Sequence, residues 1–150
     1  MRNEDKLMAV IDKIIELELP VDMRHYRSDY TGHSVDFIEV HNCGTAGCIA
    51  GWCPVLGEGD LKPIEEDFCL EGLEFGSYLE RVFWMEDEDY RHVYEWLFSS
   101  FWPNCAKAAK VRLEYAMENG YPDENSYEPE EVLVIGDKGE WVIKEDMFFW

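Results

Sequence analysis

Positive charge is the scarcest feature of this sequence. Its 150 residues include 13 lysines and arginines against 33 aspartates and glutamates, which gives a formal net charge of −20 at pH 7. A chain that grips nucleic acid or anionic lipid needs clustered lysine and arginine, because the phosphates it binds are negative. The charge balance therefore argues against direct binding to nucleic acid or to a membrane surface.

Long hydrophobic runs are missing too. Apolar stretches such as 132–135 are far shorter than the roughly 20 residues that cross a bilayer. The first residues carry acids and lysines where an export signal would have an uninterrupted apolar segment. We therefore expect a soluble, cytoplasmic protein whose five cysteines are reduced thiols rather than a disulfide framework.

The motifs of nucleotide and hydrolase chemistry are absent from the sequence. It contains no Gly-Lys-Ser/Thr phosphate loop, no Gly-x-Gly-x-x-Gly turn and no Gly-x-Ser-x-Gly elbow. Carboxylate pairs are so frequent among 33 acids that no single pair points to a reaction. We expect no enzymatic activity and no cofactor.

What the sequence does contain is enough apolar surface for a core. Apolar residues make up 47% of the chain and aromatic residues 15%, at a length typical of one domain. We therefore expect a single compact domain over residues 1–150. The segment 121–131, rich in proline, asparagine, serine and acids, is the candidate for a mobile acidic loop.

Hydrophobic spacing predicts four to five helices. They are expected to cover 4–19, 46–53, 77–84, 90–101 and 105–119, with Thr45, Ser77 and Asn104 as N-caps. A short strand is expected at 33–41, a loop between 57 and 76, and a C-terminal β-hairpin from 132–135 and 141–143. The predicted fold class is α+β.

One motif is distinctive, since residues 41–52 spell His-Asn-Cys-Gly-Thr-Ala-Gly-Cys-Ile-Ala-Gly-Trp. It resembles the pattern Cys-Gly-Thr-x-x-Cys-x-x-Gly-Trp of small proteins from bacteriophages, prophages and bacteria, most of which carry no assigned function. The matching residues are Cys43, Gly44, Thr45, Cys48, Gly51 and Trp52. The order of helices over 7–120 follows the same family pattern, which implies a phage-type protein.

The motif has a structural and a chemical interpretation. In the structural one, Gly44 allows a sharp turn into the helix that Thr45 caps. In the chemical one, Cys43 precedes a helix N-terminus, where the helix dipole favours a reactive thiolate. A metal site made by His41, Cys43 and Cys48 is a third alternative.

Acidic residues occur in short runs along the chain. Two runs form the candidate partner-binding surface: Glu65, Glu66 and Asp67, and Glu86, Asp87, Glu88 and Asp89. Closely spaced carboxylates present a field similar to that of DNA phosphates to a protein groove that normally holds nucleic acid. Candidate contact aromatics, which interface centres favour, are Trp96, Phe148, Phe149 and Trp150.

The sequence therefore predicts a small acidic phage-type protein that binds a basic, nucleic-acid-binding host protein. In this interpretation it acts as a DNA mimic that inhibits a host defence, such as a CRISPR-type system. Two alternatives stay open. One is a metal-binding or reactive-thiol protein centred on Cys43 and Cys48, and the other is a homo-oligomeric accessory protein, such as a homodimer, whose acids only keep it in solution.

Overall fold

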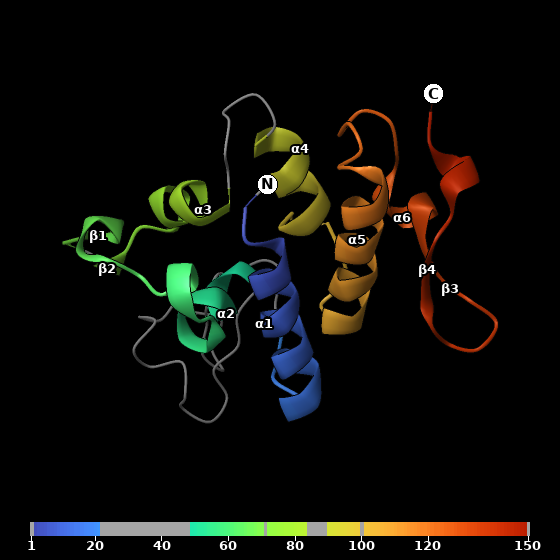
Figure 1. Cartoon of the computed structure of the whole chain (residues 1–150). Helices are drawn as coiled ribbons and strands as arrows, with labels where there is room; N and C mark the ends of the chain where they lie inside the picture. The colour runs from blue at the N-terminus through green and yellow to red at the C-terminus, as the bar shows by residue number, and fades with distance from the viewer. Residues whose placement is uncertain (1, 22–48, 71, 84–89, 100, 150) are drawn as a thin grey trace.

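The computed structural model describes residues 2–21, 49–70, 72–83, 90–99 and 101–149. The helices are α1 (Glu4–Leu17), α2 (Ile49–Leu56), α3 (Phe75–Phe83), α4 (Tyr90–Leu97), α5 (Ala106–Asn119) and α6 (Pro129–Val132) (Figure 1). The strands are β1 (Phe68–Cys69), β2 (Gly72–Leu73), β3 (Leu133–Ile135) and β4 (Trp141–Ile143). Short 3-10 helices are η2 (Gly59–Leu61), η3 (Glu65–Asp67) and η4 (Glu145–Met147). The α+β prediction is confirmed.

Helices α1 and α5 pack against each other as an antiparallel pair (Figure 1). Residues three and four apart on α1 share one face, and that face is buried at Leu7, Val10, Ile11 and Ile14. Near its middle, the pair is tied by Lys110 Nζ at 2.8 Å from Asp12 Oδ1. At the far end of α5, the Tyr121 hydroxyl donates to Glu4 Oε2 at 3.0 Å. The predicted first helix is thus confirmed, and it ends where Glu18 takes a left-handed φ of 52°.

Buried side chains from all six helices and from β3 belong to one hydrophobic cluster. Trp52 joins α2 to the end of α1, because its indole Nε1 donates to the Pro20 carbonyl at 3.0 Å. No helix in the described part of the chain is long and apolar enough to cross a membrane.

The segment predicted as a loop between the second and third helices has secondary structure. It contains η2, η3 and an antiparallel hairpin in which Phe68 pairs with Leu73, and Cys69 with Gly72. The capping box predicted at Ser77 is wrong. Helix α3 starts at Phe75, two residues earlier, and the Tyr78 N–H donates to the Glu74 carbonyl at 3.0 Å.

Other helix ends differ from the predictions by a few residues. Pro54 lies inside α2, which continues to Leu56, because a proline removes one donor without ending the helix at once. Helix α4 stops at Leu97 rather than at 101. Cys105, not Asn104, is the N-cap residue of α5. The strand predicted at 33–41 lies outside the described residues.

The C-terminal hairpin is confirmed, with Val134 of β3 paired to Val142 of β4 in an antiparallel register. Strand β4 packs on α5. Before the hairpin, the segment predicted as a mobile loop carries three buried residues, Pro122, Ser126 and Tyr127, and ends in α6. Figure 1 shows β1–β2 and β3–β4 at opposite ends of the molecule, with α1 and α5 between them.

Candidate functional site

The distinctive motif is only partly within the described structure. His41, Cys43, Gly44, Thr45 and Cys48 lie outside the described residues. Gly51 and Trp52 belong to α2 and are buried there. In the described residues, no group of three or more histidine, cysteine, aspartate or glutamate side chains is placed to hold a metal ion. The two described motif residues, Gly51 and Trp52, therefore pack inside the molecule.

The first predicted acidic run divides into exposed and buried members. Glu65 and Glu66 are exposed on η3, whereas Asp67 is buried. Asp67 is therefore wrong as a partner-binding residue, because its carboxylate is enclosed by groups of its own chain. The second run, Glu86 to Asp89, lies outside the described residues.

The Asp67 carboxylate forms the best-bonded ion pair of the described structure. Arg81 Nε donates to Oδ1 at 3.0 Å and Arg81 Nη2 to Oδ2 at 2.7 Å, while the Ile64 N–H donates to Oδ2 at 2.8 Å. Burial by itself would raise the pKa of Asp67, but the hydrogen bonds from Arg81 and Ile64 outweigh it and leave that pKa below its usual value. The same guanidinium donates to the Lys62 carbonyl at 3.2 Å. Asp67 and Arg81 thus fix the base of the β1–β2 hairpin.

Trp96 is also wrong as a contact aromatic, since its exposed fraction is 0%. Its Nε1 donates to the Arg112 carbonyl at 2.7 Å, and its ring meets Trp102 and Tyr127 edge-on, with centroids 5.4 and 5.0 Å apart. The apolar stripe of α4 is therefore wider than the sequence spacing suggested.

Arg112, at the centre of this aromatic cluster, is a buried cation that sequence reasoning missed. Nε donates to the Trp96 carbonyl at 2.9 Å and Nη2 to the Leu97 carbonyl at 3.2 Å. These carbonyls close α4, at the negative end of its dipole. The guanidinium also stacks 4.6 Å from the centre of the Trp102 ring. Burial lowers the pKa of Arg112 to about 9, so it stays charged at neutral pH. Its role is to join α4 to α5.

One residue of the aromatic C-terminus, Phe148, belongs to the core. Phe148 is buried and stacks on Tyr115 with ring centroids 5.7 Å apart. Phe149 is 57% exposed, and Trp150 lies outside the described residues. Of the predicted contact aromatics that the structure describes, only Phe149 is on the surface.

The described surface is dominated by carboxylates. Twenty of the twenty-four acidic residues in the described ranges are exposed, and eleven basic residues lie in the same ranges. Ion pairs in these ranges include Lys6 with Asp60 and Lys13 with Glu58, each at 3.6 Å. Arg112 is buried and Arg81 is paired with Asp67, so neither neutralises the exposed carboxylates. The exposed carboxylates therefore outnumber the basic side chains that remain on the described surface.

The segment from Ile64 to Leu70, which contains η3 and strand β1, also carries exposed apolar side chains. Leu70, in the turn of the β1–β2 hairpin, is fully exposed (107%), and Ile64 and Phe68 are 42% and 39% exposed. The thiol of Cys69 is exposed beside them. Sequence reasoning missed this group, because it treated the segment as a featureless loop. The signal present was an apolar cluster from 68 to 73 around a Glu-Gly pair.

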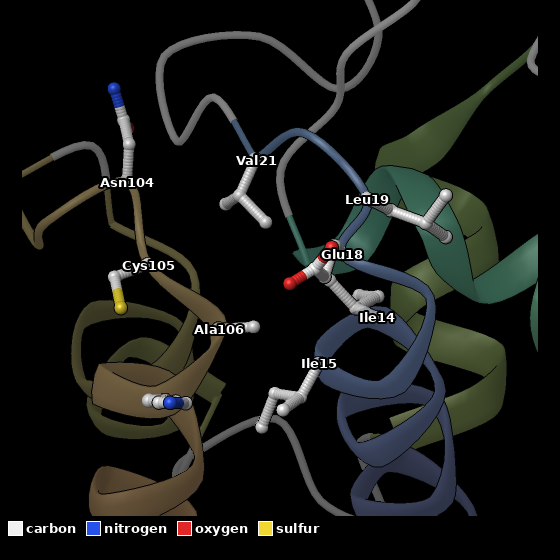
Figure 2. Close-up of a pocket in the computed structure, with 9 residues that line it drawn as sticks. Ile14, Ile15, Glu18, Leu19, Val21, Asn104, Cys105 and Ala106 are labelled. Carbon is white, nitrogen blue, oxygen red and sulfur yellow. The ribbon is translucent and has the colours of Figure 1, made fainter.

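A pocket of about 400 Å³ lies between the end of α1 and the start of α5. Its lining is Ile14, Ile15, Glu18, Leu19, Val21, Asn104, Cys105, Ala106 and Lys107. Figure 2 shows the α1 and α5 side chains facing each other across it, with the Glu18 carboxylate toward the gap. Cys105 is a free cysteine on its α5 side. Five of the lining residues are aliphatic, and Glu18, Asn104 and Lys107 add charged and polar groups to the pocket.

No protein-family model matches this chain, and neither the curated proteins nor the solved structures searched contain a match.

Proposed function

We propose that this protein is a small acidic phage-type inhibitor that works in the cytoplasm of its host. It binds a basic, nucleic-acid-binding host protein and occupies that protein's nucleic-acid site. The observation that carries the proposal is the exposure of twenty of the twenty-four described acids, against eleven described basic residues. A surface of this kind attracts the lysine and arginine side chains that normally hold phosphates.

The spacing of the exposed carboxylates supports the proposal that they mimic the row of phosphates along a nucleic-acid strand. Glu114 and Glu118 lie one turn apart on the exposed side of α5, where residues four apart have side chains about 5–6 Å from each other. A second group forms where α6 contacts η4. Its members, all exposed, are Glu130, Glu131, Glu145 and Asp146, and we call them the C-terminal acidic patch.

The proposed interaction would be driven by charge and therefore depend on salt. Exposed charges attract each other over a Debye length of about 10 Å at 0.1 M salt, and this distance shortens as salt is added. Association between oppositely charged proteins is then fast at low salt and weak at high salt. A binding partner held by mimicry must also lose its nucleic acid when the acidic protein binds.

The test is a pull-down from bacterial lysate with the purified protein as bait, washed with rising salt. We expect retained proteins to be nucleic-acid-binding and to be released by salt. A variant of the C-terminal acidic patch with Glu130→Gln, Glu131→Gln, Glu145→Gln and Asp146→Asn serves as the matched bait, because these exposed side chains can be changed without disturbing the core.

Two results would overturn the proposal. Metal in stoichiometric amount on the bait, with no salt-released partner, would place the function at Cys43 and Cys48 instead. Self-association of the bait, again without a partner, would support an accessory homo-oligomer.

A further inference from the structure

Leu70 has no evident role in folding the hairpin that presents it. The pairs Phe68–Leu73 and Cys69–Gly72 place Leu70 in the turn of the hairpin. Such turns favour asparagine, aspartate and glycine, because their backbone needs unusual angles. Leucine helps neither the turn nor the core, since its side chain is fully exposed (107%). An isolated exposed leucine is ordinary, but here Ile64 and Phe68 are also exposed in the segment that leads to it.

The base of this hairpin is held by several side-chain hydrogen bonds. Asp67 is buried and bonded twice by Arg81, which also donates to the Lys62 carbonyl. The Tyr78 hydroxyl of α3 donates to the Leu61 carbonyl at the start of the segment. A side chain on a fixed base loses less conformational entropy when it binds than one on a free loop.

The charge around the tip restricts what can cover it. Residues 58–74 contain seven acids and one lysine. Glu58, Asp60 and Asp67 pair with Lys13, Lys6 and Arg81, whereas Glu65 and Glu66 are exposed on η3 next to β1. Nucleic acid and anionic membranes would be repelled by this surface. A second copy of the chain would bring the same acids together, at a cost in electrostatic repulsion. The partner that fits is a protein with an apolar pocket surrounded by lysine and arginine.

We infer that the docking centre for such a partner is the surface formed by η3 and the β1–β2 hairpin. We call this surface the β1–β2 tip, and its residues are Ile64, Glu65, Glu66, Phe68 and Leu70. Leu70 enters the apolar pocket, and the two glutamates pair with the basic residues around it. The arrangement follows the usual anatomy of interfaces, an apolar centre with a polar rim. The inference rests on the proposed binding to a basic protein and adds the place where contact is centred.

The test uses two synthetic probes that separate the apolar contact from bulk charge. One is an amphipathic peptide of lysine and leucine, and the other is an oligolysine with the same number of lysines. Binding to the unmodified protein is measured together with the alkylation rate of each cysteine, followed by mass spectrometry. Cys69 is exposed on the hairpin, and Cys105 lines the pocket between α1 and α5, so the two thiols report on the two apolar sites.

We expect the lysine–leucine peptide to bind more tightly than oligolysine and to slow alkylation of Cys69 but not of Cys105. Leu70→Ser should lower the affinity for that peptide at least about fivefold and leave the affinity for oligolysine unchanged. Leu17→Ser is the matched control, because Leu17 is also an exposed leucine (58%), at the end of α1. It should leave both affinities unchanged.

The failures of the two proposals are distinguishable. If both peptides bind but Cys69 is alkylated as fast as without peptide, or if Cys105 is protected instead, the tip is not the docking centre. The proposed binding of a basic partner would still stand. If neither peptide binds, the proposed function itself fails. Sedimentation that shows a dimer dissociated by Leu70→Ser would also overturn the inference, since the tip would then be covered by a second copy.

Discussion

A single buried cation holds two helices and the aromatic cluster together. The Arg112 guanidinium donates to the Trp96 and Leu97 carbonyls, and in return the Trp96 indole donates to the Arg112 carbonyl. No carboxylate is needed in this arrangement, because the last carbonyls of α4 carry the negative end of the helix dipole. These carbonyls offset part of the cost of a full charge whose exposed fraction is 0%, although the buried Arg112 Nη1 has no hydrogen-bond partner among the described residues.

Replacing Arg112 should therefore destabilise the fold. Arg112→Ala is expected to lower the free energy of unfolding by about 2–4 kcal/mol, because two buried carbonyls lose their donors and a cavity opens. Arg112→Lys should recover only part of this loss, since an ammonium cannot match the planar guanidinium on both carbonyls. Urea denaturation measures the change. Lys107→Ala, at an exposed position on α5, is the control, and equal urea midpoints for Arg112→Ala and this control would contradict the account.

The Asp67–Arg81 pair predicts a specific dependence of stability on pH. The folded pKa of Asp67 lies below its unfolded value of 3.8, so its ionised form contributes stability above about pH 4. That contribution is lost as the pH falls through the folded pKa. Asp67→Asn should thus be less stable than the unchanged protein at neutral pH, by about 1–3 kcal/mol.

The measurement is urea denaturation of both proteins at pH 7 and near pH 3. The difference between them should narrow at the lower pH, because the unfolded chain there already binds a proton at Asp67, whose unfolded pKa is 3.8. A difference of the same size at both values would show that the carboxylate charge does not stabilise the hairpin base.

The role of an individual residue was harder to predict from the sequence than the position of a helix or a strand. Trp96 and Arg112 are both buried although neither fits the simple apolar spacing of its helix. Their burial depends on each other, since each satisfies a polar group of the other. Such a pair joins positions sixteen residues apart, and no local sequence pattern reports on it.

Among the elements, those with a long repeating pattern were predicted best. Helices α1 and α5 and the β3–β4 hairpin lie where periodicity and turn residues indicated. The β1–β2 hairpin was missed because its strands have only two residues each, too few to show alternation. The start of α3 was misplaced because Ser77 matched a capping pattern while the Glu74 carbonyl had already accepted the bond from the Tyr78 N–H.

The two acidic ends of the molecule should contribute unequally to binding. Neutralising Glu65 and Glu66 to glutamine removes charge next to the β1–β2 tip, whereas neutralising Glu130 and Glu131 removes the same charge at the other end. We expect the Glu65 and Glu66 substitutions to lower the affinity for the lysine–leucine peptide by about two- to fivefold. The Glu130 and Glu131 substitutions should lower that affinity less, because exposed charges act mainly within a Debye length. Isothermal titration of the two variants checks this, and equal losses would mean that only total charge matters.

For the whole molecule, the net charge of −20 should itself affect stability. Exposed acids that outnumber cations repel one another, and this repulsion destabilises the compact state. Salt screens the repulsion, so the urea midpoint should rise as sodium chloride increases from about 20 to about 200 mM. Denaturation curves at several salt concentrations measure this directly. A midpoint that falls with added salt would indicate that ion pairs such as Lys110–Asp12, rather than repulsion, dominate the surface.

The excess of acids was evident from sequence, but its arrangement was not. Residues that come together in the C-terminal acidic patch are fourteen or more positions apart, at 130–131 and 145–146, and they meet because α6 packs against η4. Asp67 shows the opposite case, an acid in a charged run that folding buries against Arg81. Tertiary packing decides which acids form a binding surface.

The most direct test of nucleic-acid mimicry is displacement of labelled duplex DNA from a protein recovered in the pull-down. Fluorescence anisotropy would follow the DNA as this acidic protein is added, at several salt concentrations. The account predicts that the DNA is released competitively and that more of the acidic protein is needed as salt rises. If the recovered partner keeps its DNA while the acidic protein is bound, the two occupy different sites, and mimicry of nucleic acid is wrong.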